Sequence, residues 1–184
     1  MPTTFEPRLD ILPESQRRLW PELDAVPTDP NAWVQRKRDT LEAFVDRGGP
    51  VKLAFFGRLD TLGRIEDPRR AAGSRVQVAS LVDLAGMKMR VIQVRGNWKD
   101  YIDIHTLASH GVDIATGLAA AKAIDGKFEP GISIRALQFY GDGTLNRVPV
   151  GIQRDLTRWA QAMDPGRLLV LQPKRGLAPG GLER

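Results

Sequence analysis

The residues of this chain best suited to chemistry are a lysine and two aspartates, Lys88, Asp100 and Asp103. Lys88 stands in an apolar run between two methionines, where an ammonium group is costly unless it is paired or faces a cleft. Asp100 and Asp103 are three residues apart in a segment with helical periodicity, so they share one face of the predicted helix. Two like charges at this spacing repel, so the pair needs a metal ion, an arginine or lysine, or a helix N-terminus beside it.

Each of these residues also has a structural explanation. The stem of Lys88 can pack along an apolar surface while its ammonium reaches water. Asp100 can cap a helix that begins near Tyr101, and the dipole of a helix N-terminus favours aspartates in the first turn. The sequence leaves the structural and the chemical interpretations open.

Several classes of chemistry are excluded by residues and motifs that the sequence lacks. It has no cysteine, which excludes disulfides, thiolate zinc sites, iron–sulfur clusters and cysteine nucleophiles. Its two histidines, His105 and His110, lie in no nucleophile motif. Neither a Walker-type phosphate loop nor a G-x-G-x-x-G dinucleotide motif is present.

The composition is that of an ordinary globular chain. Its 184 residues are 42% hydrophobic and 27% charged, which is enough for one domain with a small satellite and argues against disorder. The net charge of +5 permits an anionic partner such as a nucleotide or RNA, although a basic excess also serves solubility. No apolar stretch approaches the roughly 20 residues of a membrane span, and residues 1–10 contain no apolar signal core. We therefore expect a cytoplasmic protein with no membrane partner.

The front of the chain reads as a mixture of short elements. Residues 40–46 and 51–57 are strand-like, and the Arg-Gly-Gly-Pro between them predicts the turn of a β-hairpin. Valines at 76 and 78 predict a third short strand. We further expect a short amphipathic helix over 13–24, helical turns over 31–38 and an exposed connection over 58–75, which holds five arginines.

The back of the chain has helical periodicity. Helices are predicted over residues 80–95, 98–111, 113–126, 130–140 and 150–162. Ser80 and Asp113 are expected as N-caps and Gly111 as a C-terminal stop, while Gly86 either allows close packing or weakens its helix. The fold class is therefore α+β, with a small antiparallel sheet followed by a helical bundle. The predicted domains are an α/β core over 1–79, a helical domain over 80–171 and a flexible tail over 172–184.

Three stretches together resemble one known family. They are ILPESQRRLWPELDAVP, DTLEAFVDRGGPVKLAFFG, and ASLVDLAGMKMRVIQVRGNWKDYIDIHTLASHGVDIATGLAAAKAI followed by FEPGISIRALQFYGDGTL. The chain is thereby similar to the AbiEii/AbiGii-type nucleotidyltransferase toxins, a branch of the polymerase-beta-like nucleotidyltransferase superfamily. The most specific part is a helix with a lysine, a short break and then Lys-Asp-Tyr-x-Asp-Ile, and the similarity covers most of residues 9–165.

The resemblance implies a function and a set of site residues. Such enzymes transfer a nucleotidyl group from a nucleoside triphosphate to an acceptor, some of them to transfer RNA, with Mg²⁺ neutralising the phosphates, and they belong to systems with an antitoxin. By position, Lys88 and Lys99 would contact the nucleotide. Asp100 and Asp103 would be the catalytic residues of the same pocket, one of them as a base, and weak metal ligands.

The sequence departs from the family pattern at its metal-binding motif. The family has a Gly-Gly-Thr or Gly-Ser turn and then an Asp-x-Asp pair between its first helix and its hairpin. Here residues 24–38 run directly into the hairpin, and no Asp-x-Asp precedes Asp100. Without these ligands we expect nucleotidyl transfer to be lost or impaired. The missing segment would also uncover apolar surface at the sheet edge, which self-association or a partner could cover.

Three hypotheses follow. The chain is a nucleotidyltransferase-type toxin homologue with lost or impaired activity, a non-catalytic module that binds nucleotide, RNA or a partner, or a decayed scaffold. Convergence of Lys88, Asp100 and Asp103 on one place would favour the first two hypotheses, and separation of the three would favour the last.

Overall fold

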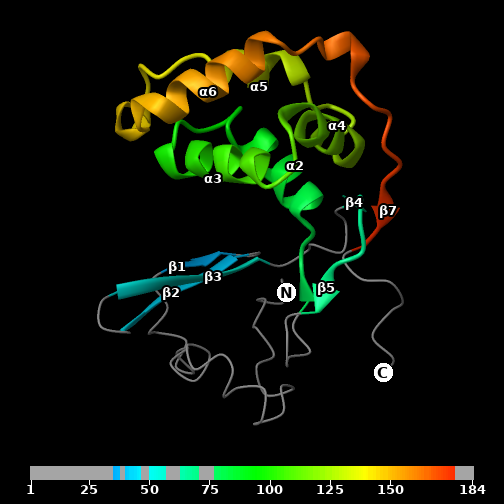
Figure 1. Ribbon diagram of the computed structural model, residues 1–184. Coiled ribbons are helices and arrows are strands. Elements are labelled where there is room, and N and C mark those ends of the chain that lie inside the picture. The colour runs from blue at the N-terminus through cyan, green and yellow to red at the C-terminus, as the bar shows by residue number, and fades with distance from the viewer. Residues whose placement is uncertain (1–34, 38–39, 47–49, 57–62, 71–76, 177–184) are drawn as a thin grey trace. The chain divides into compact units, whose positions relative to one another are not determined.

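The computed structural model describes residues 35–37, 40–46, 50–56, 63–70 and 77–176 (Figure 1). The chain divides into two compact units. The first comprises Met1–Thr61 and Arg70–Val78, and the second comprises Leu62–Arg69 and Ala79–Arg184. The helix expected over 13–24 lies outside the described residues.

The first unit contains a small antiparallel sheet. Its strands β1 (Gln35–Lys37), β2 (Thr40–Asp46) and β3 (Pro50–Phe56) lie in the order β1-β2-β3. The expected hairpin is confirmed, because β2 pairs antiparallel with β3 from Thr40 opposite Phe56 to Asp46 opposite Pro50. The expected helical turns over 31–38 are wrong for Gln35–Lys37, since these residues pair with β2. Long-range pairing overrides local propensity here, and the charged side chains suit an edge strand.

Residues 58–75 were expected to form an exposed connection. Part of this segment pairs with a strand near the C-terminal end of the second unit. Strand β4 (Gly63–Arg64) pairs antiparallel with β7 (Lys174–Arg175). The Arg64 side chain is buried because its guanidinium donates to the carbonyl oxygens of Arg175 and Gly176, each at 2.7 Å. Two further short strands are β5 (Arg69–Arg70) and β6 (Gln77–Val78), and β6 is the third strand expected near the valines. Flexibility of the tail over 172–184 stays a prediction.

Helices make up most of the second unit (Figure 1). They are α2 (Leu81–Val91), α3 (Trp98–Ser109), α4 (Ile114–Ile124), α5 (Pro130–Ala136) and α6 (Val150–Gln161), with 3₁₀ turns at Leu145–Arg147 and Pro165–Arg167. The α+β fold class is confirmed. Among the described residues, no helix is both long and apolar enough to cross a membrane.

The expected caps are confirmed where the signal is local. The Ser80 hydroxyl accepts from the Asp83 amide at 3.0 Å, and Asp113 accepts from the Thr116 amide at 2.7 Å. Gly111 follows the end of α3 with φ of 93°, a conformation that favours glycine. Asp83 in turn accepts from the backbone amide of Ile65 at 2.6 Å, which fastens the connection before β5 to the start of α2.

Two expected helix ends are wrong. Helix α2 was expected to reach residue 95 but ends at Val91, and α5 was expected to reach residue 140 but ends at Ala136. Asn97 rather than Asp100 caps α3, because its side-chain oxygen accepts from the Lys99 amide at 3.0 Å. Asp100 lies in the first turn of α3, whereas Asp103 lies beyond it.

The helices surround one apolar core in which α2 packs closely on α4. Leu118 of α4 is fully buried, and Met89 of α2 is 1% exposed. A Cβ atom on Gly86 would lie 3.0 Å from both the Ala120 Cβ and the Ala121 backbone nitrogen. Of the two interpretations of Gly86, close packing is therefore confirmed, since a side chain would meet backbone that cannot easily give way.

Two of the helical glycines, Gly86 and Gly151, form a matched pair for a stability test. Gly151→Ala in α6 meets nothing within 4 Å, so we expect a gain of up to about 1 kcal/mol in the free energy of unfolding from helix propensity. Gly86→Ala should instead lower that free energy by about 1 kcal/mol, because overpacking outweighs propensity. Urea unfolding measures both, and an equal gain in the two variants would contradict the close packing.

Candidate functional site

The side chains of Lys88, Asp100 and Asp103 converge, as the functional hypotheses require. The Lys88 Nζ atom donates to Asp100 Oδ1 at 2.9 Å and to Asp103 Oδ2 at 2.5 Å. Helix α2 supplies the lysine, and one face of α3 supplies both aspartates. The lysine does not simply extend into water, since its side chain is only 22% exposed and ends between two carboxylates. We call these three residues the Lys88 cluster.

Asp100 is the most buried member of this cluster and has a second cation. Its side chain is 2% exposed, and Arg95 donates from Nε to Oδ2 at 2.9 Å and from a terminal nitrogen to Oδ1 at 3.3 Å. Arg95 lies in the turn between α2 and α3, outside both helices. Arg95 was not predicted from the sequence, although the like-charged aspartate pair indicated that a cation should lie beside it.

The two cations determine the charge state of the cluster. Burial alone would raise the pKa of Asp100, but the hydrogen bonds from Arg95 and Lys88 outweigh it and hold that pKa below its ordinary value. Burial likewise opposes the charge on Lys88, but Asp103 and Asp100 together raise the pKa of this ammonium group. The charged forms of Asp100 and Lys88 are therefore stabilised at neutral pH.

Tyr101 fixes the start of α3 beneath the cluster. Its ring is 1% exposed, and its hydroxyl donates to the Ala136 carbonyl oxygen at the end of α5 at 3.0 Å. Burial raises the pKa of Tyr101 to about 12, so the phenol stays protonated at neutral pH and serves as a donor. The tyrosine thereby holds the N-terminal turn of α3, and Asp100 with it, against α5.

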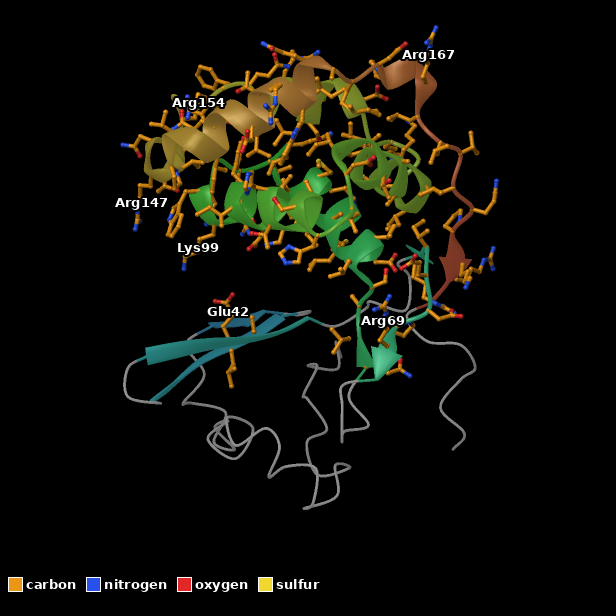
Figure 2. All side chains as sticks on the ribbon, in the orientation of Figure 1. Glu42, Arg69, Lys99, Arg147, Arg154 and Arg167 are labelled. Atoms are coloured by element: carbon orange, nitrogen blue, oxygen red, sulfur yellow. The ribbon has the colours of Figure 1, made fainter. Side chains whose placement is uncertain are left out.

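Lys99 does not join the cluster that its neighbour Asp100 forms. It is exposed, and its Nζ lies 5.8 Å from the centroid of the Trp98 ring, over which Arg147 also lies at 4.7 Å. Figure 2 shows Lys99 and Arg147 at the same end of the helical unit. The nucleotide-binding role expected of Lys99 stays a prediction.

The described residues do not fit a divalent metal ion well. They contain no group of three or more acidic or histidine side chains placed to hold one. Both oxygens of Asp100 already accept from cations, so a metal ion would have to displace Arg95 or Lys88. Glu42 is a carboxylate of the first unit, where it lies on β2 (Figure 2). The weak metal-ligand role expected of the aspartates stays a prediction.

The two histidines have structural partners. His105 Nε2 lies 3.2 Å from Asp155 Oδ2, and its ring stacks on Trp159 at 5.2 Å between centroids, so it connects α3 to α6. His110 Nδ1 lies 2.8 Å from the Thr106 carbonyl oxygen one turn earlier. Neither histidine contacts the Lys88 cluster.

Comparison with known proteins identifies one family. The model of the family described as "Nucleotidyl transferase AbiEii toxin, Type IV TA system" matches residues 37–169, which is most of the chain. The match includes β2, β3, the Lys88 cluster and all the helices described above. No curated protein and no solved structure shows significant similarity to the chain.

The buried carboxylate of Asp100 makes a testable contribution to stability. Because its folded-state pKa lies below the ordinary value of 3.8, this contribution is complete above that pH and is lost as the pH falls through the folded-state pKa. We expect Asp100→Asn to lower the free energy of unfolding by about 1–3 kcal/mol at pH 7. The deficit relative to the unmodified chain should shrink below pH 3.8.

Urea unfolding between pH 2 and pH 7 provides the measurement. Asp142→Asn is the matched control, since this aspartate is exposed and has no side-chain partner among the residues that the structure describes. A deficit for Asp100→Asn that stays constant down to the lowest pH would contradict the assigned ion pairs.

Proposed function

Because this chain belongs to the AbiEii family of nucleotidyl transferase toxins of type IV toxin-antitoxin systems, we propose that its Lys88 cluster binds a nucleoside triphosphate, while nucleotidyl transfer is lost or strongly impaired. The natural acceptor in this proposal is an RNA, such as the end of a transfer RNA. The observation that carries the proposal is the convergence of Lys88 with Asp100 and Asp103 at a partly open edge of the helical unit.

The exposures within the cluster favour phosphate binding at Lys88. Asp100 is sealed in at 2% exposure, whereas Asp103 is 48% exposed. An incoming phosphate can therefore replace Asp103 as the outer partner of the ammonium without disturbing the buried ion pair. Arg95, with a side chain 58% exposed, offers a second cation at the same edge.

The expected loss of transfer rests on the metal ligands. Nucleotidyl transfer belongs to the phosphoryl-type reactions, in which metal ions position the phosphates and neutralise the developing charge. No Asp-x-Asp precedes Asp100 in the sequence, and the two oxygens of Asp100 are occupied by cations. The family's transfer reaction depends on Mg²⁺, and this chain is poorly equipped to perform that step.

The RNA acceptor is supported by the surface around Trp98. Arg147 lies 4.7 Å and Lys99 5.8 Å from the centroid of this partly buried ring, and the two cations lie at one end of the helical unit (Figure 2). Such a pair of cations suits the phosphate backbone of an RNA. We assign Lys99 to this surface rather than to the Lys88 cluster.

Nucleotide binding at the cluster is tested by thermal unfolding with each of the four nucleoside triphosphates, with and without Mg²⁺. At about 100 times the dissociation constant a ligand stabilises the folded state by about 2.7 kcal/mol, which corresponds to a rise of several degrees in Tm. We expect such a rise with at least one triphosphate, and we expect Lys88→Ala to abolish it.

Lys127→Ala is the matched control, since this exposed lysine has no side-chain partner among the described residues and should keep the full rise. The absence of a rise with every triphosphate at millimolar concentration would refute nucleotide binding. Transfer from a labelled triphosphate to total transfer RNA is assayed in parallel. Rapid transfer that disappears in Lys88→Ala would refute the proposed loss of activity.

A second candidate function is that of an interaction module. Three large apolar side chains of α2 are at least 36% exposed within the second unit, namely Leu81, Leu84 and Met87. In the first unit β3 is an edge strand of the described sheet, and its sequence is rich in apolar residues. A second copy of the chain or an antitoxin could cover such surfaces, as edge strands and apolar patches commonly require.

Light scattering after size-exclusion chromatography tests this second candidate. We expect the chain to form a dimer whose fraction rises with concentration, and Leu84→Asp to shift it toward the monomer. A chain that is strictly monomeric at about 100 micromolar would refute self-association. Binding of a purified cognate antitoxin to that monomer would then be the remaining form of this candidate.

A further inference from the structure

The helical unit contains a cavity that the Lys88 cluster does not line. It has a volume of about 480 Å³ and lies between the turn after α2, the first turn of α3, the end of α5 and the segment from Phe139 to Leu145. Its volume lies within the range of small-molecule sites. The cavity shares Tyr101 and Ala136 with the hydrogen bond that holds α3 against α5, and it shares Arg95 with the contacts of Asp100.

The mouth of this cavity carries an exposed aromatic ring. Phe139 is 55% exposed although it lies just beyond α5, and Val94 and Ile132 beside it are 82% and 40% exposed. Gly141 leaves room for the ring, because a Cβ atom there would lie 2.9 Å from it. An exposed ring of this kind offers a flat surface for stacking.

Charged groups of both signs line the same cavity. Arg135 is exposed and has no ion-pair partner among the residues that the structure describes. Arg95 presents a 58% exposed side chain on another wall. Asp142 is a carboxylate without a side-chain partner in the described part of the chain, so it can accept hydrogen bonds from a ligand.

The wall that holds Asp142 is built by close backbone packing. The Thr144 amide donates to the Gly96 carbonyl oxygen at 3.1 Å, and a side chain on Gly143, whose φ is 56°, would collide with that same oxygen. The segment from Gly141 to Thr144 is therefore tied to the turn before α3. This backbone contact holds one wall of the cavity in place, which lowers the ordering cost of binding.

We propose that this cavity is a second nucleotide site, distinct from the Lys88 cluster. The base stacks on Phe139, Arg135 and Arg95 face the phosphate, and Asp142 accepts from an exocyclic amino or ring N–H group of the base. A flat aromatic group joined to an anion satisfies all three features, whereas an inorganic anion leaves the Phe139 ring unused and an aliphatic ligand leaves the arginines unused. The site shares Arg95 with the proposed triphosphate site, whereas Phe139, Arg135 and Asp142 belong to it alone.

The experiment is calorimetric titration of the full chain with each of the four ribonucleoside 5′-monophosphates in EDTA, so that no metal-dependent binding contributes. At least one of them should bind saturably, and inorganic phosphate should bind at least about tenfold more weakly. Phe139→Ala and Arg135→Gln should each raise the dissociation constant at least about fivefold through loss of stacking and of the phosphate contact.

The controls separate this cavity from the Lys88 cluster. Leu169→Ala removes another exposed apolar side chain, and Arg154→Gln removes an arginine of α6 (Figure 2) that has no ion-pair partner in the described part of the chain, so both variants should bind as the unmodified chain does. Lys88→Ala shows whether any of the binding belongs to the Lys88 cluster instead. The proposal is overturned if no monophosphate binds at millimolar concentration, if phosphate alone binds as tightly, or if Lys88→Ala abolishes binding that Phe139→Ala and Arg135→Gln leave intact.

Discussion

The carboxylate of Asp100 is the constraint on which the arrangement of the helical unit depends. A charge that is 2% exposed is tolerated only with close partners, and here it has two, Lys88 from α2 and Arg95 from the following turn. These contacts join three successive parts of the chain at one point. They position the N-terminal turn of α3, and Tyr101 in that turn then reaches Ala136 at the end of α5. The Lys88 cluster and the neighbouring cavity therefore share one electrostatic support.

The same ion pairs decide what a ligand must overcome. Lys88 is already neutralised by two carboxylates, so a phosphate competes with them and does not meet a free ammonium group. Competition is least costly at Asp103, whose exposed carboxylate returns to water when it is released. Displacement at Asp100 would leave a buried charge with one partner fewer. Asp100 is thus the fixed partner of Lys88, whereas Asp103 is the contact that a ligand can exchange.

Local signals in the sequence predicted more of this molecule than non-local ones. The caps at Ser80 and Asp113, the stop at Gly111 and the β-hairpin depend on neighbouring residues, and all were predicted correctly. The strand Gln35–Lys37 was missed because its pairing with β2 lies outside any local pattern. The need to compensate the like-charged pair indicated a cation, a metal ion or a helix N-terminus beside the aspartates, and left open whether Lys88 would supply the charge. Arg95 was missed because the apolar periodicity continues past Val91, so the sequence placed this arginine inside a helix rather than in a turn.

The Lys88 cluster does not by itself indicate catalysis, because its ion pairs also stabilise the fold. Lys88 and Asp100 stabilise the fold through a buried ion pair whether or not a nucleotide ever binds, so their presence is explained by packing alone. Membership of the AbiEii family is likewise carried by a match over residues 37–169 in which the helices are intact. Turnover depends on something else, namely carboxylates free to hold metal ions against the phosphates. In the described residues the best-placed carboxylate is committed to Arg95 and Lys88, and the family's Asp-x-Asp does not precede it in the sequence. In the part of the chain that the structure describes, the ion pairs of the cluster are present and no group of carboxylates is placed to hold a metal ion, which is the basis of our proposal that the chain binds a nucleotide without transferring it.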